Sequence, residues 1–222
     1  MALAVSVNQR QMVNKFTQAG NGAEMARRRL DADQSKTLIL DAVEELMRRE
    51  GFAAVNTRSV AHEAGMKPPL VHYHFETTEN LLLAAYRRSA ARSEFLLDEA
   101  LRSRRPLRAL WQYTSDPQRS ALATQFMALA GEKPAIREEM ASNVENFRLR
   151  QTQALAAQAA AAPRALGITP EILAILIAAL GRALVMETSI GVTSGHVATR
   201  ELVERLIQQL EPDEPSKSPA RA

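Results

Sequence analysis

The chain contains no cysteine among its 222 residues. Disulfides, thiolate zinc sites, iron–sulfur clusters and cysteine nucleophiles are therefore all excluded. A chain of this length can bury a sizeable core without covalent cross-links. We therefore expect a protein of a reducing compartment, the cytoplasm.

Long apolar runs are also lacking. The N-terminal residues reach Arg10 before an apolar segment of signal-peptide length has formed. The most apolar segment, residues 172–180, is followed by Arg182 and Glu187, which leaves it short of the roughly 20 apolar residues of a membrane span. We expect no export signal and no membrane segment.

Neither sign of charge is in large excess, since the formal net charge is +3. Residues 1–105 hold 16 Lys and Arg against 13 Asp and Glu, whereas residues 106–222 hold 12 of each. An excess in the N-terminal half is compatible with nucleic-acid binding, but a solvated helical surface would have the same composition.

Signals for β-strands are essentially missing, and apolar residues recur three and four positions apart, which predicts an all-α protein. The expected helices cover residues 35–50, 57–64, 68–75, 78–101, 107–113, 117–130, 134–162, 169–190 and 199–210. We expect a flexible basic arm over residues 1–30, an N-terminal domain over 31–80, a C-terminal domain over 81–211 and a disordered tail over 212–222.

Two short predicted helices, joined by a tight turn at Gly65, follow the first predicted helix. A short helix that projects from a three-helix body fits the DNA major groove, so residues 56–83 are compatible with a helix-turn-helix. An ordinary helical hairpin inside an all-α domain has the same pattern. The periodicity of these residues leaves both interpretations open.

The run TRSVAHEAGMKPPLVHYHFETTENLL, residues 57–82, resembles the N-terminal signature of the TetR family of bacterial transcriptional repressors. The similarity extends from Ser35 to Ala85, and beyond it only the length and the helical pattern agree. The resemblance implies a homodimer with one helix-turn-helix DNA-binding domain per subunit. It also implies a C-terminal helical domain for dimerisation and for binding a small-molecule effector.

The same resemblance assigns DNA contacts residue by residue. Arg58 would contact a base or a phosphate, and its guanidinium fork suits guanine O6 and N7. Asn56 and Thr57 can each cap the second helix, and the resemblance favours Thr57, which would also offer its backbone N–H to a phosphate. The other expected DNA-binding residues belong to the third helix and the start of the fourth: Lys67, Pro68, Pro69, Leu70, His72, Tyr73, His74 and Thr78. His74 could equally be a satisfied, partly buried histidine.

Thr78 departs from the family pattern, which commonly has lysine at this position and so provides a charged phosphate contact. His72 stands in place of tyrosine and leaves the base preference at its position open. The basic triplet Arg27, Arg28 and Arg29 is placed where an arm can reach the phosphate backbone or a minor groove, although such a triplet is often only solvated.

Motifs for catalysis are incomplete. His62 and Glu63 begin a zinc-helix motif, but Met66 stands where its second histidine would be. His72 and His74 lie two residues apart on a helix and therefore point apart. No glycine-rich phosphate loop and no nucleophile elbow is present. We expect no enzyme, no catalytic residue, no metal and no cofactor.

The last two predicted helices carry enough apolar surface to form a four-helix dimer interface with their symmetry mates. The expected interface residues are Ile172, Leu176, Ala179, Arg182, Ala183, Leu202 and Leu206. The small residues Ala178 and Gly181 would also let helices approach closely, between subunits or within one. An effector pocket is expected at Trp111, Tyr113, Gln125, Phe126, Met127, Met140, Asn143, Phe147 and Met186. Their mostly apolar character favours a largely hydrophobic effector.

These observations favour a homodimeric repressor that binds a pseudo-palindromic operator on double-stranded DNA and leaves it when a small ligand binds. One alternative is a helical ligand-binding or adaptor protein that dimerises without reading DNA. A small helical enzyme is a third interpretation, which the incomplete motifs disfavour.

Overall fold

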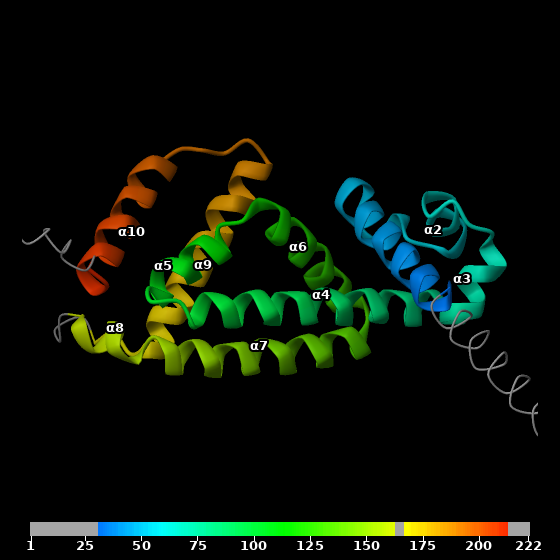
Figure 1. Ribbon diagram of the computed structural model, residues 1–222. Helices are drawn as coiled ribbons and strands as arrows, with labels where there is room; N and C mark the ends of the chain where they lie inside the picture. Colours follow the sequence, from blue (N-terminus) through cyan, green and yellow to red (C-terminus); the bar gives the residue numbers. More distant parts are fainter. Residues whose placement is uncertain (1–30, 163–166, 213–222) are drawn as a thin grey trace, which may run out of the picture.

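The computed structural model describes residues 31–162 and 167–212, and within these ranges it contains helices and loops but no β-strand. The predicted all-α class is therefore confirmed. The molecule is elongated, with α2 and α3 at one end and α8 and α10 at the other (Figure 1). The predicted arm over residues 1–30 lies outside the described residues.

A helix over residues 31–50, called the leading helix below, comes first. The other elements are η1 (Phe52–Ala54), α2 (Thr57–Glu63), α3 (Pro68–Phe75), α4 (Thr78–Leu101), α5 (Pro106–Thr114), α6 (Pro117–Glu132), α7 (Pro134–Ala154), α8 (Ala156–Ala161), α9 (Pro170–Ser189) and α10 (His196–Leu210). Several helix starts follow local chemistry. Thr169 caps α9 by accepting from the Ile172 N–H, and Pro170 occupies its first position, as the sequence predicts.

Several predicted helix bounds are wrong. The first helix begins at residue 31 rather than at Ser35, whose hydroxyl donates to the Asp31 carbonyl, 2.8 Å away, and α10 begins at His196 rather than at residue 199. The single helix predicted over residues 134–162 is two helices, because the backbone of Leu155 turns away from α-helical geometry between α7 and α8. The Leu155 side chain is fully buried, so packing of the core holds this bend without glycine or proline.

The long helices α4 and α7 lie side by side and run in the same direction (Figure 1). Arg87 of α4 binds Glu139 of α7, and farther along Asp98 of α4 accepts from Arg150 of α7, 2.8 Å away. Both pairs join residues 52 positions apart in the sequence, which is the signature of parallel helices. The two helices thus form a spine that connects the ends of the molecule.

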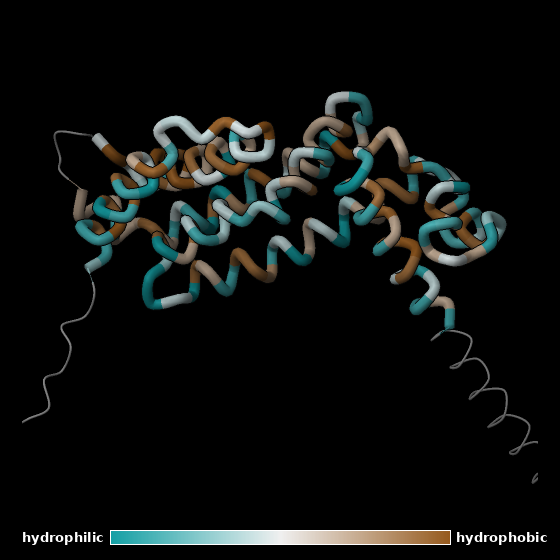
Figure 2. Tube along the Cα trace, turned by 90° about the horizontal axis from the view of Figure 1, so that it is seen from above, coloured by the Kyte–Doolittle hydropathy of each residue, from teal (hydrophilic) through white to brown (hydrophobic). Residues whose placement is uncertain are grey.

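Two hydrophobic cores lie along this spine. The first joins the leading helix, α2 and α3 to the N-terminal part of α4, to α6 and to the start of α7. The second joins the C-terminal part of α4 to α5, α8, α9 and α10. Most helices change between hydrophobic and hydrophilic along their length in Figure 2, because amphipathic helices alternate such residues at helical spacing.

The start of α5 is capped by a residue more than one hundred positions away. Both carboxylate oxygens of Glu211 accept from this helix, one from the Leu107 N–H and the other from the Arg108 N–H, each at 3.0 Å. Glu211 is buried and follows directly after α10. The cap therefore holds the end of the last helix against α5.

Replacing Glu211 by alanine is expected to lower the free energy of unfolding by about 2 kcal/mol, because two buried N–H groups lose a charged acceptor. Urea unfolding followed by circular dichroism measures the change. Glu204→Ala is the matched control: Glu204 is a half-exposed glutamate of α10 that binds Arg108 at 2.8 Å, and its loss should cost less than about 0.5 kcal/mol. Equal effects of the two variants would contradict the capping role.

Candidate nucleic-acid interface and internal cavity

The N-terminus of α2 is fixed by Asn56. Its side-chain oxygen accepts from the Arg58 and Ser59 N–H groups at 3.0 and 3.1 Å, and the Ser59 hydroxyl completes a capping box. Of the two residues expected as possible caps, Asn56 is the cap, which corrects the role that the resemblance assigned to the Thr57 side chain. Thr57 is the first residue of the helix, and its N–H has no partner within the described residues.

Helix α3 follows the turn at Gly65, which has φ +64°. Lys67 precedes the helix, and Pro68 and Pro69 form its first turn, where no intrahelical N–H is needed. Val71 and Phe75 are buried against the first core. Tyr73 is 78% exposed, and His72 is exposed beside it. The helix thus presents its proline turn, Leu70, His72 and Tyr73 to solvent at one end of the molecule.

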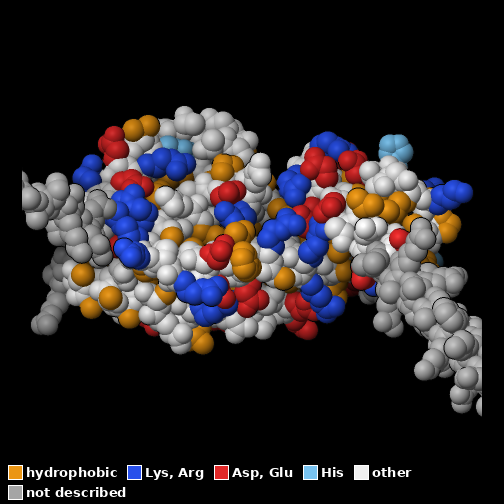
Figure 3. All heavy atoms as spheres, viewed as in Figure 1, with side chains coloured by type: hydrophobic (Ala, Val, Ile, Leu, Met, Phe, Trp, Pro, Cys, Tyr) orange, Lys and Arg blue, Asp and Glu red, His pale blue; other side chains and the backbone are white. Residues whose placement is uncertain are grey.

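Two basic residues near α3 differ from most of their neighbours in lacking an acidic partner. Across the middle of the face in Figure 3, basic and acidic side chains are interspersed. Among the paired cations, Arg88 binds the buried carboxylate of Glu44 at 2.7 Å, and Arg49 binds Glu63 of α2 at 2.8 Å. Arg58 and Lys67 are exposed and form no ion pair within the described chain. They are therefore available to an external anion.

His74 is partly buried, because it lies at the boundary between the side of α3 that packs on the core and the side that faces solvent. Burial, with a smaller effect of the positive charge of Lys36, lowers the pKa of His74 below its usual value. Its Nε2 atom is buried and has no hydrogen-bond partner among the described residues, so His74 is not the satisfied buried histidine considered above. A neutral ring at this position supplies no positive charge to a phosphate.

The turn from α3 to α4 is tight. Glu76 has φ +59°, and the Thr77 N–H donates to the Phe75 carbonyl at 2.6 Å, which describes a γ-turn. Thr77 caps α4 by accepting from the Asn80 N–H, so Thr78 is the first residue of the helix. The basic triplet Arg27, Arg28 and Arg29 lies outside the described residues.

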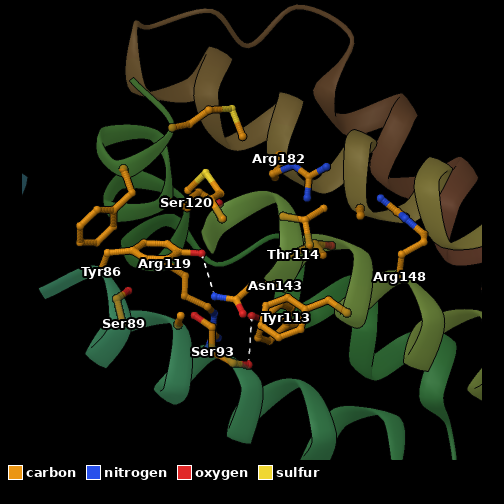
Figure 4. A pocket seen from close by; sticks show the side chains of 18 of the residues that line it. Tyr86, Ser89, Ser93, Tyr113, Thr114, Arg119, Ser120, Asn143, Arg148 and Arg182 are labelled. Carbon is orange, nitrogen blue, oxygen red and sulfur yellow. Dashed lines mark hydrogen bonds between the residues drawn. The ribbon is translucent and has the colours of Figure 1, made fainter. Parts of the chain in front are cut away.

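A cavity of about 200 Å³ lies between α4, α5, α6, α7 and α9 (Figure 4). Six of the nine residues expected around a pocket line it: Tyr113, Phe126, Met127, Met140, Asn143 and Phe147. The Asn143 side-chain amide donates to the Tyr86 hydroxyl at 3.0 Å, and the Tyr113 hydroxyl donates to the Ser93 carbonyl at 3.3 Å. Burial raises the pKa of both phenols, so they remain neutral.

Three residues expected around the pocket lie elsewhere. Trp111 is buried in the second core, because it lies on the side of α5 that faces away from the cavity. Gln125 accepts from the Phe52 N–H at 3.0 Å and so ties α6 to η1. Met186 is exposed on α9. Gln125 and Phe126 are neighbours in sequence, but one residue rotates a helix position by about 100°, so only Phe126 faces the cavity.

The sequence interpretation missed the charged part of the cavity wall. Arg119, Arg148 and Arg182 line it, together with Tyr86, Ser93 and Gln151, and its lining contains no acidic residue. A signal for Arg148 was present, since Met140, Val144 and Arg148 lie four apart on α7 and therefore on one side of the helix. The expectation of a largely hydrophobic effector therefore describes only part of the wall.

Helices α9 and α10 expose an apolar surface, called the α9–α10 face below. All seven residues expected at a dimer interface are exposed: Ile172, Leu176, Ala179, Arg182, Ala183, Leu202 and Leu206. Ile175, Met186 and Val197 extend the same surface. Ala178 and Gly181, by contrast, are buried inside the subunit.

Helix α9 is long and apolar enough to cross a membrane by length and composition alone, contrary to the expectation from its charges. This criterion is weak evidence, because the core helix of a soluble protein also meets it. Seven residues of α9 are buried against neighbouring helices, among them Leu173, Ile177 and Leu184. Within the described residues, no group of three or more His, Asp or Glu side chains could hold a metal ion.

Comparisons with known proteins agree with this arrangement. Residues 39–85 match the family model described as bacterial regulatory proteins, tetR family. A comparison with curated protein sequences finds no match.

Among solved structures, a putative TetR-family transcriptional regulator from Rhodococcus sp. is 22% identical, with a TM-score of 0.63 over 80% of this chain and 99% of that one. A putative transcriptional regulator from Saccharomonospora viridis in complex with choline is 19% identical, with a TM-score of 0.62 over 80% of this chain and 94% of that one. A TetR transcription regulator from Haloarcula marismortui is 16% identical, with a TM-score of 0.62 over 79% of this chain and 97% of that one.

Proposed function

This chain carries the helix-turn-helix of TetR-family regulators over residues 39–85 and their fold over most of its length, and on that premise we propose a dimeric transcriptional repressor. The repressor binds a pseudo-palindromic operator in the cytoplasm and leaves it when a small molecule occupies the cavity. In this proposal residues 31–80 form the DNA-binding domain, and residues 81–211 form the effector-binding and dimerisation domain.

The observation that carries the proposal is the exposed side of α3. This helix has only eight residues, and two of its apolar side chains, Val71 and Phe75, are enough to fix it on the first core. Its other residues, apart from the partly buried His74, are turned to solvent beside Arg58 and Lys67, two cations without ion-pair partners in the described chain. A short helix in the major groove reads bases, and flanking cations neutralise phosphates.

Dimerisation through the α9–α10 face supports the same function. An exposed apolar surface of this kind is typical of a protein interface, and two-fold pairing of α9 and α10 buries it in a four-helix bundle. A two-fold dimer carries two α3 helices and so requires an operator with two related half-sites. The distance between the two helices then decides whether both fit successive major grooves.

Helix α6 connects the cavity to the DNA-binding end. Phe126 lines the cavity and packs edge-to-face on Tyr86 with ring centres 5.4 Å apart, and the adjacent Gln125 holds the Phe52 N–H of η1. A ligand that displaces Phe126 therefore also moves the attachment of η1. Such a ligand relieves repression if it prefers the dimer geometry whose α3 helices no longer match the operator.

The test is binding of the purified protein to duplex fragments from the DNA flanking its own gene, over a series of salt concentrations. We expect one fragment to bind far more tightly than random DNA and to weaken steeply with salt. Arg58→Ala and Tyr73→Ala should each weaken this binding about 10-fold or more, since a good side-chain contact to a base contributes about 1–3 kcal/mol.

Arg102→Ala is the control, because Arg102 is exposed at the far end of α4 and should leave DNA binding unchanged. Preferred binding that persists in both the Arg58 and the Tyr73 variants would contradict the assigned reading surface. If a genome-wide selection of bound fragments also finds no preferred DNA, the chain is a ligand-binding or adaptor protein instead.

A further inference from the structure

The arginines of the cavity wall are unevenly paired. Arg119 binds Asp116 at 3.1 Å, and its guanidinium lies over the Tyr113 ring, 4.6 Å from the ring centre. Arg148 and Arg182 form no hydrogen bond or ion pair within the described residues. One terminal nitrogen of Arg148 is buried without any partner. Arg148 and Arg182 thus have all their side-chain donors unused, whereas Arg119 is paired through one terminal nitrogen and only its Nε atom is buried without a partner among the described residues.

Arg148 on α7 and Arg182 on α9 lie on the same side of the cavity, with their guanidinium groups turned toward one another (Figure 4). Although Arg182 as a residue is exposed, partial desolvation of its guanidinium lowers its pKa, and the positive charge of Arg148 lowers it further. Arginine nevertheless stays protonated in proteins, so two like charges face each other in a partly desolvated space. An anion between them would remove this repulsion.

The rest of the wall is uncharged and largely apolar. Phe126, Met140, Val144 and Phe147 line it, and Asn143 and Tyr113 are neutral. A volume of about 200 Å³ lies below the usual range for drug-sized ligands, so the cavity suits a small compound. A planar carboxylate can accept from the forked donors of both arginines, while an aromatic or aliphatic body fills the apolar part.

We propose that the effector is a small monocarboxylic acid, whose carboxylate binds Arg148 and Arg182 and whose apolar body contacts Phe126, Met140 and Phe147. This inference rests on the proposed function, because it names the class of molecule that the regulator senses. Since Arg182 belongs to α9, binding of the acid would draw α7 toward the helix that carries the α9–α10 face. A cationic compound of the same shape would be repelled.

The test compares matched compounds that differ only in charge: benzoate, benzyl alcohol and benzylamine, then hexanoate, hexanol and hexylamine. Thermal unfolding measures binding, and fluorescence of Trp111, the only tryptophan, gives an independent reading. At about ten times its dissociation constant, an acid should raise Tm by about 4 °C. Alcohols should have a smaller effect, and amines should have none.

Arg148→Gln and Arg182→Gln should each weaken binding of the acids about 10-fold or more and leave binding of the alcohols unchanged. Arg150→Gln is the matched control on α7, because Arg150 is engaged by Glu94 and Asp98 at 3.0 and 2.8 Å. The inference is overturned if neither acid binds, if alcohols or amines bind as well as the acids, or if both cavity variants bind the acids like the wild type.

DNA binding separates this inference from the proposed function. The wild type and Arg148→Gln should bind the preferred DNA fragment equally in the absence of acid. Benzoate or hexanoate should release only the wild-type protein. If the protein binds specific DNA but does not respond to acids, the carboxylate inference is wrong and the proposed function as a transcriptional regulator still holds. If the protein binds acids but no specific DNA, the proposed function as a transcriptional regulator is wrong.

Discussion

Glu44→Gln is expected to lower the free energy of unfolding by about 3 kcal/mol, because this change leaves a cluster of arginines without its shared buried carboxylate. The Glu44 side chain is only 2% exposed. One oxygen accepts from Arg88 at 2.7 Å, and the other lies 3.1 Å from Arg48 and 3.3 Å from Arg92. The pairs with Arg88 and Arg92 join the leading helix to α4, whereas Arg48 lies on the leading helix itself. Chemical denaturation in urea measures the loss.

Glu45→Gln is the matched control, since Glu45 neighbours Glu44 and binds the same Arg48 at 2.9 Å but is 51% exposed. Exposed ion pairs contribute less than about 1 kcal/mol, so this variant should be close to the wild type. A double-mutant cycle with Arg88→Met isolates the Glu44–Arg88 coupling. A Glu44 variant as stable as the Glu45 variant would show that the buried carboxylate does not hold the two helices together.

Gly181→Val is expected to lower the free energy of unfolding by about 3 kcal/mol by forcing α5 and α9 apart. A Cβ atom at position 181 would lie 2.5 Å from the Thr114 hydroxyl oxygen, 2.9 Å from the Thr114 Cβ and 3.0 Å from its carbonyl carbon. The last two atoms cannot move without the backbone of α5. Because Thr114 lines the cavity, ligand binding should weaken as well. Urea unfolding and ligand titration give the two measurements.

Gly131→Ala supplies the control with the opposite sign. A Cβ atom at position 131 has no neighbour within 4 Å, and the residue lies in the last turn of α6. Alanine there should raise the free energy of unfolding by about 0.5 kcal/mol through helix propensity and a less flexible unfolded chain. Thr114→Ala should partly restore the Gly181→Val protein. Without such rescue, steric overlap with the Thr114 hydroxyl is not the cause of the loss.

The sequence predicted the elements whose determinants are local. Pro68, Pro170 and the capping residue Thr169 lie next to the helix starts that they determine. The Leu155 bend and the Glu211 cap could not be predicted, because each depends on packing between segments that are distant in the chain. Local chemistry decides where a helix starts, whereas tertiary contacts decide where it bends and what caps it from outside.

The candidate sites divide in the same way. Residues of α2 and α3 could be predicted from a contiguous motif, apart from the identity of the cap at Asn56. The cavity is assembled from five helices, and whether a side chain lines it depends on the rotation of each helix. Arg182 illustrates the difficulty: its position on α9 was predicted to face a second subunit, yet its guanidinium also lines the cavity beside Arg148.

The first hydrophobic core has a consequence for how such a protein can be altered. Leu81, Phe126, Leu129 and Ile136 belong to the same core as the residues that support α3. The segment up to α3 therefore cannot be exchanged alone. In a chimera joined at the start of α4, the leading helix, α2 and α3 of one protein would pack on α6 and α7 of another, whose side chains do not match them. We expect new operator preferences to arise through substitutions on the exposed side of α3. Exchange of the whole segment from the leading helix to α3 also requires exchange of the part of α6 that packs against it.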